Sequence, residues 1–249
     1  MTTQLTQNIV NPFYAPYASE PVHQMAKLPR APINGSPVPR LTSLYHNDVP
    51  GTFGDRTYPG NCGGNLIHDL LRFFKPKHVF DPMSGSGTCR DVCRELGIDH
   101  WSSDIHEGFD LSDPRNFYGD HALFERRMFD FVWIHPPYWR MKLYASNPQD
   151  LSRAPTLEDF LERYARVITH CAYVLKPGGK LAILMGDYSD REAGFVPLTY
   201  HTKRLAFASG LNQTCTDIIR FSHGASSSRK VYRSSFIPGL HDVCAVFTK

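Results

Sequence analysis

In three stretches of the chain, apolar residues recur every three or four positions, which is the spacing of an amphipathic helix. The first stretch ends at Lys75-Pro76, the second at Gly97 and the third at Pro177-Gly178-Gly179, and such residues stop helices. Thr156 and Asp159 form a capping pair ahead of the third stretch. The apolar positions are Leu66, Ile67, Leu70, Leu71 and Phe74; then Cys89, Val92, Cys93 and Leu96; then Phe160, Leu161, Tyr164, Ile168, Cys171, Ala172 and Leu175. A shorter helix is expected up to Gly210.

Short, continuous apolar runs lie between these helices and predict buried strands. They are HVFD at 78–81, a segment ending near SSDI at 102–105, FDFVWI at 129–134, KLAILMG at 180–186, and segments around 213–221 and 241–248. Alternating strands and helices favour a doubly wound α/β domain with a mostly parallel sheet, closed by a C-terminal antiparallel strand pair. Residues 1–54 are rich in Pro, Asn, Ser and Thr and show no period. We therefore expect an irregular N-terminal arm over 1–54 and one domain over 55–249.

The composition is that of an ordinary globular protein. The 249 residues are 41% hydrophobic and 20% charged, which excludes a stapled miniprotein and a disordered chain. No window approaches the roughly 18 apolar residues of a membrane span, and the start does not resemble a signal peptide, so a cytoplasmic location is expected. The six cysteines show neither CxxC pairs nor zinc-finger spacing, which predicts mostly buried, reduced thiols and no metal site.

Positive charge is concentrated near the C-terminal end. The whole chain carries +3, whereas residues 201–249 contain seven basic and two acidic residues, a local excess of +5. These cations could meet phosphates or could form a solvated basic face, and charge alone leaves both interpretations open. The basic side chains concerned are Lys203, Arg204, Arg220, Arg229, Lys230 and Arg233.

A glycine loop, DPMSGSGT, follows the first predicted strand. Glycines let the backbone turn sharply and approach a ligand, and the helix after them offers unpaired N–H groups to an anionic part of it. The loop is not a P-loop, because no GK[ST] follows, and Arg90 stands where the dinucleotide fingerprint needs a third small residue. A simple tight turn is the alternative.

Asp104 lies about twenty residues beyond this loop, at the end of the next predicted strand. An acidic side chain there can accept hydrogen bonds from both hydroxyls of a ribose, so the pair of features indicates a ligand that contains a nucleoside. Asp110 could meet the adenine amino group of the same ligand. Asp113 could make this contact in place of Asp110. For both residues, the alternative is an acidic side chain in a solvated loop.

The strand FDFVWI ends abruptly in His135-Pro136-Pro137-Tyr138-Trp139. Two prolines cannot continue a central strand, so the backbone is held stiff and its carbonyls can point into a cleft. The aromatic side chain beside them is a stacking platform for a planar ring. A Pro-rich turn with a core aromatic residue is the alternative.

In this order, DPMSGSGT, Asp104 and HPPY, followed by LKPGGKLAILMGD, resemble the S-adenosylmethionine-dependent amino-methyltransferases of the DNA N6-adenine and N4-cytosine type. The resemblance covers about 55–249 and implies the Rossmann-like fold of class I methyltransferases. It implies S-adenosylmethionine as cofactor, DNA as partner with RNA possible, a nucleoid-associated location, and a monomer or homodimer. N6-adenine is favoured over N4-cytosine as the methylated base.

The resemblance also implies roles for individual residues. The methionine part of the cofactor would lie against the loop, its ribose against Asp104 and Ile105, and its adenine against Asp110, while Asn61 in the Tyr58-Pro59-Gly60-Asn61 segment would add a contact. Tyr138 would stack on a base flipped out of its helix. Loops around Trp139 and near the C-terminal end would receive the polymer. The implied loop residues are Asp81, Pro82, Met83, Ser84, Gly85, Ser86, Gly87 and Thr88. The implied catalytic residues are His135, Pro136, Pro137 and Tyr138. The implied polymer contacts are Trp139, Arg140, Tyr144, Ser228, Arg229, Lys230 and Arg233.

The chemistry explains the need for such residues. The lone pair of an exocyclic base amine is delocalised into the ring, so acceptors on its N–H bonds are needed to direct that pair toward a sulfonium methyl. The Pro136 carbonyl can be one acceptor and the neutral His135 imidazole another, and loss of transfer below about pH 6.5 is then expected. His135 stands where the wider class has Asp, Asn or Ser, which removes the usual cue for the base. An RNA methyltransferase, a protein glutamine methyltransferase and a silent binding module remain alternatives.

Overall fold

A single mixed sheet lies at the centre of the described chain. The computed structural model describes residues 35–46, 49, 51–124, 126–221, 237 and 239–249. The strand order is β1-β9-β10-β5-β4-β2-β3, and β8 also pairs with β10. The strands are β1 Leu44–Tyr45, β2 His78–Asp81, β3 Asp99–Ser102, β4 Phe129–Ile134, β5 Leu175–Met185, β8 Asn212–Gln213, β9 Ile218–Phe221 and β10 His241–Thr248, and a separate hairpin is formed by β6 Tyr188–Asp190 and β7 Gly194–Val196.

The sheet has a parallel half and an antiparallel half. Strands β5, β4, β2 and β3 are parallel neighbours, while β10 runs antiparallel to both β5 and β9. The sequence therefore correctly predicted a doubly wound α/β fold in which parallel strands end in a C-terminal antiparallel pair. At the far edge, β1 pairs in parallel with β9.

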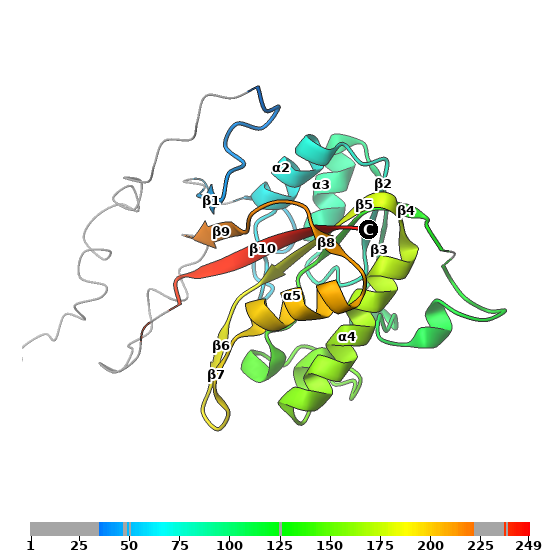
Figure 1. Cartoon of the computed structure of the whole chain (residues 1–249), viewed down its shortest axis with the longest axis vertical. Helices are drawn as coiled ribbons and strands as arrows, with labels where there is room; N and C mark the ends of the chain where they lie inside the picture. The colour runs from blue at the N-terminus through cyan, green and yellow to red at the C-terminus, as the bar shows by residue number, and fades with distance from the viewer. Residues whose placement is uncertain (1–34, 47–48, 50, 125, 222–236, 238) are drawn as a thin grey trace, which may run out of the picture.

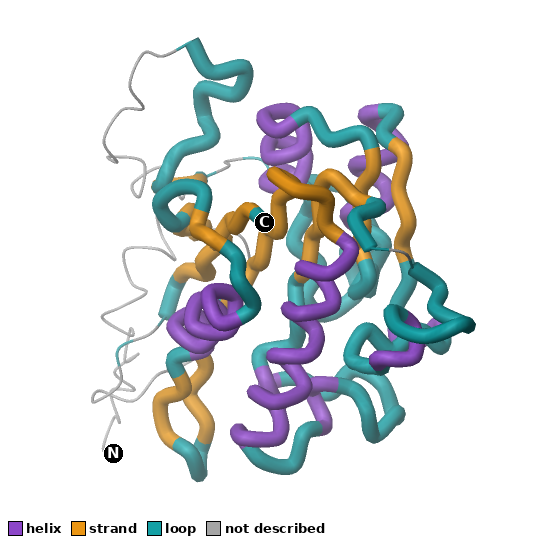
Figure 2. Tube along the Cα trace, turned by 45° about the vertical axis from the view of Figure 1, so that its right-hand side comes forward, coloured by secondary structure: helices purple, strands orange, loops and turns teal. Residues whose placement is uncertain are grey.

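Helices cover both faces of this sheet. The helices are α2 Asn65–Phe74, α3 Thr88–Leu96, α4 Leu157–Val174 and α5 Leu198–Ala208. Alternate strand residues face opposite helices: Val79 packs in the cluster of α2 and α3, and its neighbour Phe80 in the cluster of α4 and α5. Figure 1 shows α2 and α3 above the sheet and α4 and α5 below it, and Figure 2 shows the strands lying between the helices.

The helix boundaries follow the signals in the sequence. The Thr156 side chain accepts a hydrogen bond from the Asp159 N–H at 3.1 Å, as the predicted capping pair requires. Gly97 ends α3 with φ +65°, a left-handed conformation that glycine adopts without steric cost. No helix in the described part of the chain is both long enough and apolar enough to span a membrane.

Two expectations about strands were wrong in detail. Pro177-Gly178-Gly179 does not separate a helix from a strand, because β5 already begins at Leu175, opposite Phe129. The extra residues form a bulge, in which Gly178 and Gly179 hydrogen-bond to the Lys249 backbone. The segment predicted around 213–221 is divided into β8 and β9, because residues 214–217 turn between them.

Of the described residues of the predicted N-terminal arm, Leu44 and Tyr45 join the sheet as β1. Arg40 donates two hydrogen bonds, of 2.6 and 2.7 Å, to the two carboxylate oxygens of Asp69 on α2. The Tyr45 hydroxyl donates a third to Asp69 at 2.7 Å, and both Asp69 and Tyr45 are buried. A buried carboxylate needs such partners, so Asp69 fixes the arm to the domain.

The order of the parallel strands creates the position for a site. The chain passes from β2 to β3 on one side and then returns to β4 on the other side of β2. In open α/β sheets, ligands bind outside the carboxyl ends of the strands at such a reversal. Asp81 ends β2 and His135 follows β4, so both residues flank this point.

Candidate active site

A cleft opens at the carboxyl ends of β2, β3 and β4. It encloses about 870 Å³ of space, its open mouth included. Most of the predicted site residues line it, namely Asp81, Pro82, Met83, Ser84, Gly85, Ser86, Thr88, Asp104, Ile105, Asp110, His135, Pro137 and Tyr144. Asn61, Gly87, Pro136, Tyr138, Trp139 and Arg140 are not among the lining residues.

The glycine loop is a folded turn at the N-terminus of α3. Gly85 and Gly87 have φ of +46° and +78°, values that side chains other than glycine adopt rarely. The Gly87 N–H donates to the Ser84 carbonyl at 2.7 Å, and the Ser84 N–H to the Ser103 carbonyl at 3.0 Å. The loop therefore connects the ends of β2 and β3 and presents its backbone to the cleft.

Asp104 is held against this loop. Its carboxylate accepts hydrogen bonds from the Gly85 N–H at 3.0 Å and from the His106 N–H at 3.1 Å. Its side chain is 13% exposed and lines the cleft. A carboxylate fixed in this way keeps lone pairs for hydroxyl donors, as a ribose site needs.

The structure distinguishes Asp110 from its rival. Asp110 lines the cleft, and one of its oxygens accepts hydrogen bonds from the backbone and the hydroxyl of Ser112, both at 2.8 Å. Asp113 instead caps a short 3-10 helix and pairs with Arg115 at 2.6 Å. Only Asp110 is therefore placed to meet a ligand in the cleft.

Asp81 is the least satisfied polar group of the site. It is 1% exposed, and neither of its carboxylate oxygens makes a hydrogen bond of ordinary geometry within the described residues. Burial, reinforced by the nearby charge of Asp104, raises the pKa of Asp81 to about 8. A buried acid without a partner at the wall of a cleft is suited to bind a cationic or hydrogen-bond-donating ligand.

The segment before α2 covers the glycine loop. The Asn61 amide donates hydrogen bonds to the Phe53 and Asp55 carbonyls and to the Ser86 hydroxyl, at 3.0 to 3.1 Å. Asn61 thus supports the wall and does not itself line the cleft. Tyr58, which does line it, lies so close to Gly85 that an added Cβ there would be 3.0 Å from its ring.

The Tyr144 side chain is also part of this cover. Its ring stacks on Tyr58 with centroids 5.9 Å apart, and both rings line the cleft. The two side chains come from loops more than eighty residues apart in the sequence, one before and one after the glycine loop. Tyr144, predicted as a polymer contact, therefore lies in the cleft beside Tyr58.

His135 and Tyr138 contact each other after β4. The His135 Nε2 lies 3.1 Å from the Tyr138 hydroxyl, and burial raises the pKa of that phenol well above its usual range. The hydroxyl therefore stays protonated and can donate to a neutral imidazole. An amine that is to hydrogen-bond to this nitrogen has to replace the hydroxyl.

Two features of neighbouring strands influence Tyr138, one through packing and the other through charge. A Cβ on Gly186 would lie 2.6 Å from Tyr138 Cε2, so the ring packs directly on the backbone after β5. Arg220 and Asp242 form a buried ion pair across β9 and β10, at 2.8 Å and 2.5 Å, and the charges of both act on Tyr138. The Arg220 guanidinium also donates to the Cys62 carbonyl at 2.9 Å.

This burial fits neither interpretation offered for Arg220, which were contact with phosphates and a solvated basic face. Its guanidinium is committed to Asp242 and Cys62, and the residue is 5% exposed. Lys203 likewise pairs with Asp217, whereas Arg204 is exposed. The predicted polymer contacts Ser228, Arg229, Lys230 and Arg233 lie outside the described residues.

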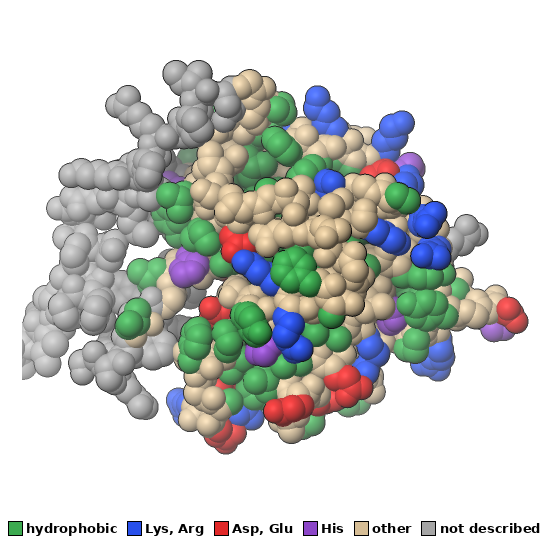
Figure 3. Space-filling model, viewed as in Figure 1, with side chains coloured by type: hydrophobic (Ala, Val, Ile, Leu, Met, Phe, Trp, Pro, Cys, Tyr) green, Lys and Arg blue, Asp and Glu red, His purple; other side chains and the backbone are tan. Residues whose placement is uncertain are grey.

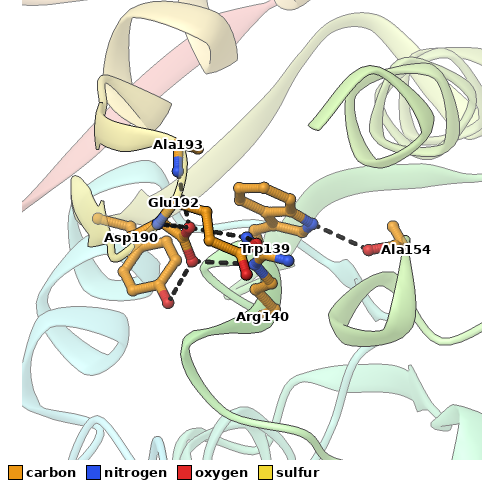
Figure 4. A network of polar contacts seen from close by, with 7 residues as sticks. Trp139, Arg140, Ala154, Asp190, Glu192 and Ala193 are labelled. Carbon is orange, nitrogen blue, oxygen red and sulfur yellow. Dashed lines mark hydrogen bonds and ion pairs between the residues drawn. The ribbon is translucent and has the colours of Figure 1, made fainter. Parts of the chain in front are cut away.

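Trp139 and Arg140, also predicted as polymer contacts, are engaged within the protein. Trp139 is 2% exposed, and its indole N–H donates to the Ala154 carbonyl at 3.0 Å. Arg140 pairs with Asp190 and Glu192 on the β6–β7 hairpin, each at 2.7 Å (Figure 4).

Other lining residues had no signal in the sequence. Gln149, Asp150 and Leu151 line the cleft from the loop after Tyr144. Asp150 is buried and accepts hydrogen bonds from the Ala145 and Ser152 N–H groups, so it shapes this loop. Local spacing alone could not place this loop beside the glycine loop, more than sixty residues away.

No protein-family model matches the sequence, and no curated protein matches it. Among solved structures, the chain is similar to TTHA0409 of Thermus thermophilus, a proposed DNA modification methylase, in complex with S-adenosyl-L-methionine, at 18% identity and a TM-score of 0.38. That match covers 69% of this chain and 55% of the other, so the chain spans about half the length of TTHA0409.

Two further structures match more of their own length. A SAM-dependent methyltransferase from Archaeoglobus fulgidus is 15% identical with a TM-score of 0.45, covering 74% of this chain and 93% of the other. The Burkholderia thailandensis 1,6-didemethyltoxoflavin-N1-methyltransferase, with bound S-adenosylhomocysteine, is 12% identical with a TM-score of 0.45, covering 74% and 77%.

Proposed function

We propose that this protein is an S-adenosylmethionine-dependent methyltransferase that acts on the exocyclic amino group of a base in DNA, with adenine N6 favoured over cytosine N4. One observation carries the proposal: the sheet brings the unpaired carboxyl of Asp81, the anchored carboxylate of Asp104 and the rigid turn at His135 to one cleft. These features come from three adjacent strand ends.

The described residues fit the cofactor. Asp81, buried without a partner, suits the ammonium group of the methionine part, and the glycine loop suits its close approach. Asp104 suits the ribose hydroxyls, and Asp110 the adenine amino group. Tyr58 and Tyr144 would cover the cofactor and exclude water. When bound, S-adenosylmethionine supplies an electrophilic sulfonium methyl.

The turn after β4 supplies groups for an amine acceptor. Pro136 and Pro137 hold the backbone rigid, so the Pro136 carbonyl can accept one N–H of the amine. The neutral His135 imidazole can accept the other, since it already faces a donor hydroxyl at 3.1 Å. The same nitrogen can take up the proton that the amine loses.

DNA is favoured as the acceptor by the HPPYW motif and by the family resemblance of residues 55–249. The Tyr138 ring packs on the Gly186 backbone. It offers the stacking platform that a flipped base needs.

The test measures methyl transfer from labelled S-adenosylmethionine to unmethylated duplex DNA by three proteins. We expect Tyr138→Ala to lower the transfer rate about ten- to a hundredfold, since stacking is lost, and to change cofactor affinity less than about twofold. Tyr138→Phe is the matched control, because it keeps the ring and removes only the hydroxyl, and it should keep most of the activity. Undiminished transfer by Tyr138→Ala would overturn the assigned acceptor site.

A complementary variant tests the cofactor side. Asp104→Ala should weaken binding of S-adenosylmethionine in a calorimetric titration by about tenfold or more, because it removes the acceptor for the ribose hydroxyls. Asp113→Ala is the control, since Asp113 pairs with Arg115 outside the cleft. Equal affinities of the two variants would contradict the assigned ribose site.

A further inference from the structure

The residue after the PPY tyrosine has a strained backbone. Trp139 has φ +48°, in the left-handed region that residues other than glycine rarely enter. Such a conformation persists only where the surrounding contacts hold it, and it is found mainly at functional sites. Since Trp139 directly follows Tyr138, its backbone sets the direction in which the chain leaves the proposed stacking ring.

Two contacts hold the Trp139 side chain in place. The indole N–H donates to the Ala154 carbonyl at 3.0 Å, which fixes one edge of the buried ring (Figure 4). The Arg140 guanidinium lies over the ring, 4.5 Å from its centroid. Arg140 is thus in contact with the residue whose backbone is strained.

Arg140 is itself held by the β6–β7 hairpin. Its Nε and Nη2 donate to the two carboxylate oxygens of Asp190, at 2.9 and 2.7 Å, and Nη2 also reaches Glu192 at 2.7 Å (Figure 4). Such a two-point contact fixes the direction of a guanidinium as well as its distance. The hairpin therefore orients Arg140 and does not merely neutralise its charge.

Asp190 is the centre of this network. Its side chain is 6% exposed, whereas that of Glu192 is 81% exposed. Besides Arg140, Asp190 accepts hydrogen bonds from the Tyr188 hydroxyl at 3.1 Å and from the backbone N–H groups of Glu192 and Ala193 at 2.8 and 2.9 Å. These bonds make Asp190 a rigid point in the hairpin.

We infer that Asp190 is a positioning residue of the proposed methyl transfer: through Arg140 it holds the strained turn at Trp139 and thereby the orientation of the Tyr138 ring. Trp139 and Arg140 then act through Tyr138 and not as contacts to the polymer. This inference rests on the function proposed above. It assigns to the β6–β7 hairpin the task of keeping the acceptor half of the site in order.

The first test compares Asp190→Asn in two backgrounds. Asparagine keeps the size of the side chain and removes the charge that orients Arg140. We expect Asp190→Asn to lower kcat/KM for the DNA acceptor about tenfold, with the enzyme concentration counted as cofactor-binding sites. The dissociation constant of S-adenosylmethionine should stay within about twofold of the wild-type value. In a Tyr138→Ala background the same change should cost less than about twofold, because the ring through which it acts is absent.

Two matched variants complete this comparison. Glu192→Gln removes the exposed member of the network, and Glu162→Gln breaks an exposed ion pair with Arg166 on α4. Both should leave kcat/KM within about twofold of the wild type. A full tenfold cost of Asp190→Asn in the Tyr138→Ala background would overturn the inference, as would a parallel loss of cofactor affinity.

A second readout does not depend on activity. The indole N–H of Trp139, assigned with Trp139→Phe, should exchange with solvent at least about tenfold faster in Asp190→Asn than in the wild type, because the turn is no longer held. Unchanged indole exchange would overturn the inference even if transfer falls. Absence of methyl transfer by the wild-type protein would instead contradict the proposed function, while the indole exchange would still decide whether Asp190 holds the turn.

Discussion

Two buried carboxylates near the ligand edge of the sheet have opposite surroundings. Asp242 is paired with Arg220, and its charge helps to raise the pKa of Tyr138. Asp81 has no such partner, and its burial raises its pKa to about 8. A carboxyl that is isolated in this way does not contribute to the stability of the empty protein, which supports a role in binding.

Asp81 predicts a pH dependence of both stability and binding. Between about pH 4 and pH 8 the folded protein keeps a proton on Asp81 that the unfolded chain has lost, so the free energy of unfolding falls as the pH rises, by at most about 1.4 kcal/mol per pH unit. Denaturant unfolding of the wild type should show this slope, and Asp81→Asn should reduce it. A slope unchanged by the substitution would contradict the assignment.

The same group predicts proton release on cofactor binding. At pH 7 the Asp81 carboxyl is mostly protonated, and an ammonium group placed beside it favours the ionised form. Calorimetric titration of S-adenosylmethionine in buffers of different ionisation enthalpy should therefore show release of up to about one proton. Asp81→Asn should abolish the release, and release that persists in this variant would assign it to another group.

Gly186 allows a direct test of the Tyr138 position. Gly186→Ala adds a methyl group 2.6 Å from Tyr138 Cε2, so the ring has to move. We expect the transfer rate to fall about tenfold or more, with cofactor affinity within about twofold of the wild type. Gly35→Ala is the control, because no atom lies within 4 Å of the added Cβ. Full activity of Gly186→Ala would show that transfer does not need this ring position.

At the scale of elements, the glycine loop is held from two directions. Its Ser84 N–H bonds to the end of β3, and its Ser86 carbonyl accepts the Asp55 N–H from the segment before α2. The described part of the N-terminal arm is fixed to α2, because Arg40 and Tyr45 both bind Asp69.

The contact between Arg40 and Asp69 predicts an effect on stability and no effect on catalysis. Arg40→Ala removes two hydrogen bonds from buried Asp69, and the free energy of unfolding should fall by about 1–3 kcal/mol. Arg72→Ala, an exposed change on the same helix, should cost less than about 0.5 kcal/mol. Equal stabilities of the two variants in denaturant unfolding would show that the arm is not anchored through Asp69.

The elements that were predicted from the sequence are those with a strong local signal. The apolar period and the stop residues predicted α2 and α3 to within a residue, and the capping pair predicted the start of α4. Strand β10 agrees with its predicted range. The β6–β7 hairpin was missed, because its short strands are partly exposed and lack an apolar run. Strand β1 was missed because its two residues form a strand only through pairing with distant β9.

The site was predicted in part for the same reason. Asp81, Asp104 and His135 follow buried strands, so their sequence position fixes their place at the sheet edge. Trp139 and Arg140 follow the same turn, yet their partners are Ala154 and the distant Asp190, which no local pattern reveals. The sequence therefore places these two residues beside the predicted turn but does not reveal their contacts within the protein.

At the scale of the whole molecule, the order of the strands bears on where the cleft lies, and the distribution of charge bears on where a polymer could bind. The reversal of strand order between β2 and β4 accounts for the position of the cleft. On the face shown in Figure 3, Lys and Arg side chains are spread over the surface and do not form one continuous patch.

The most direct test of the proposed function identifies the methylated product. The full chain is incubated with labelled S-adenosylmethionine and, separately, with unmethylated duplex DNA, single-stranded DNA and RNA, and the nucleosides are then analysed by mass spectrometry. We predict labelled N6-methyladenine in DNA, lost in Tyr138→Ala. Label confined to RNA or to protein, or no methylated base despite cofactor binding, would contradict the assignment of this site to a DNA base amine.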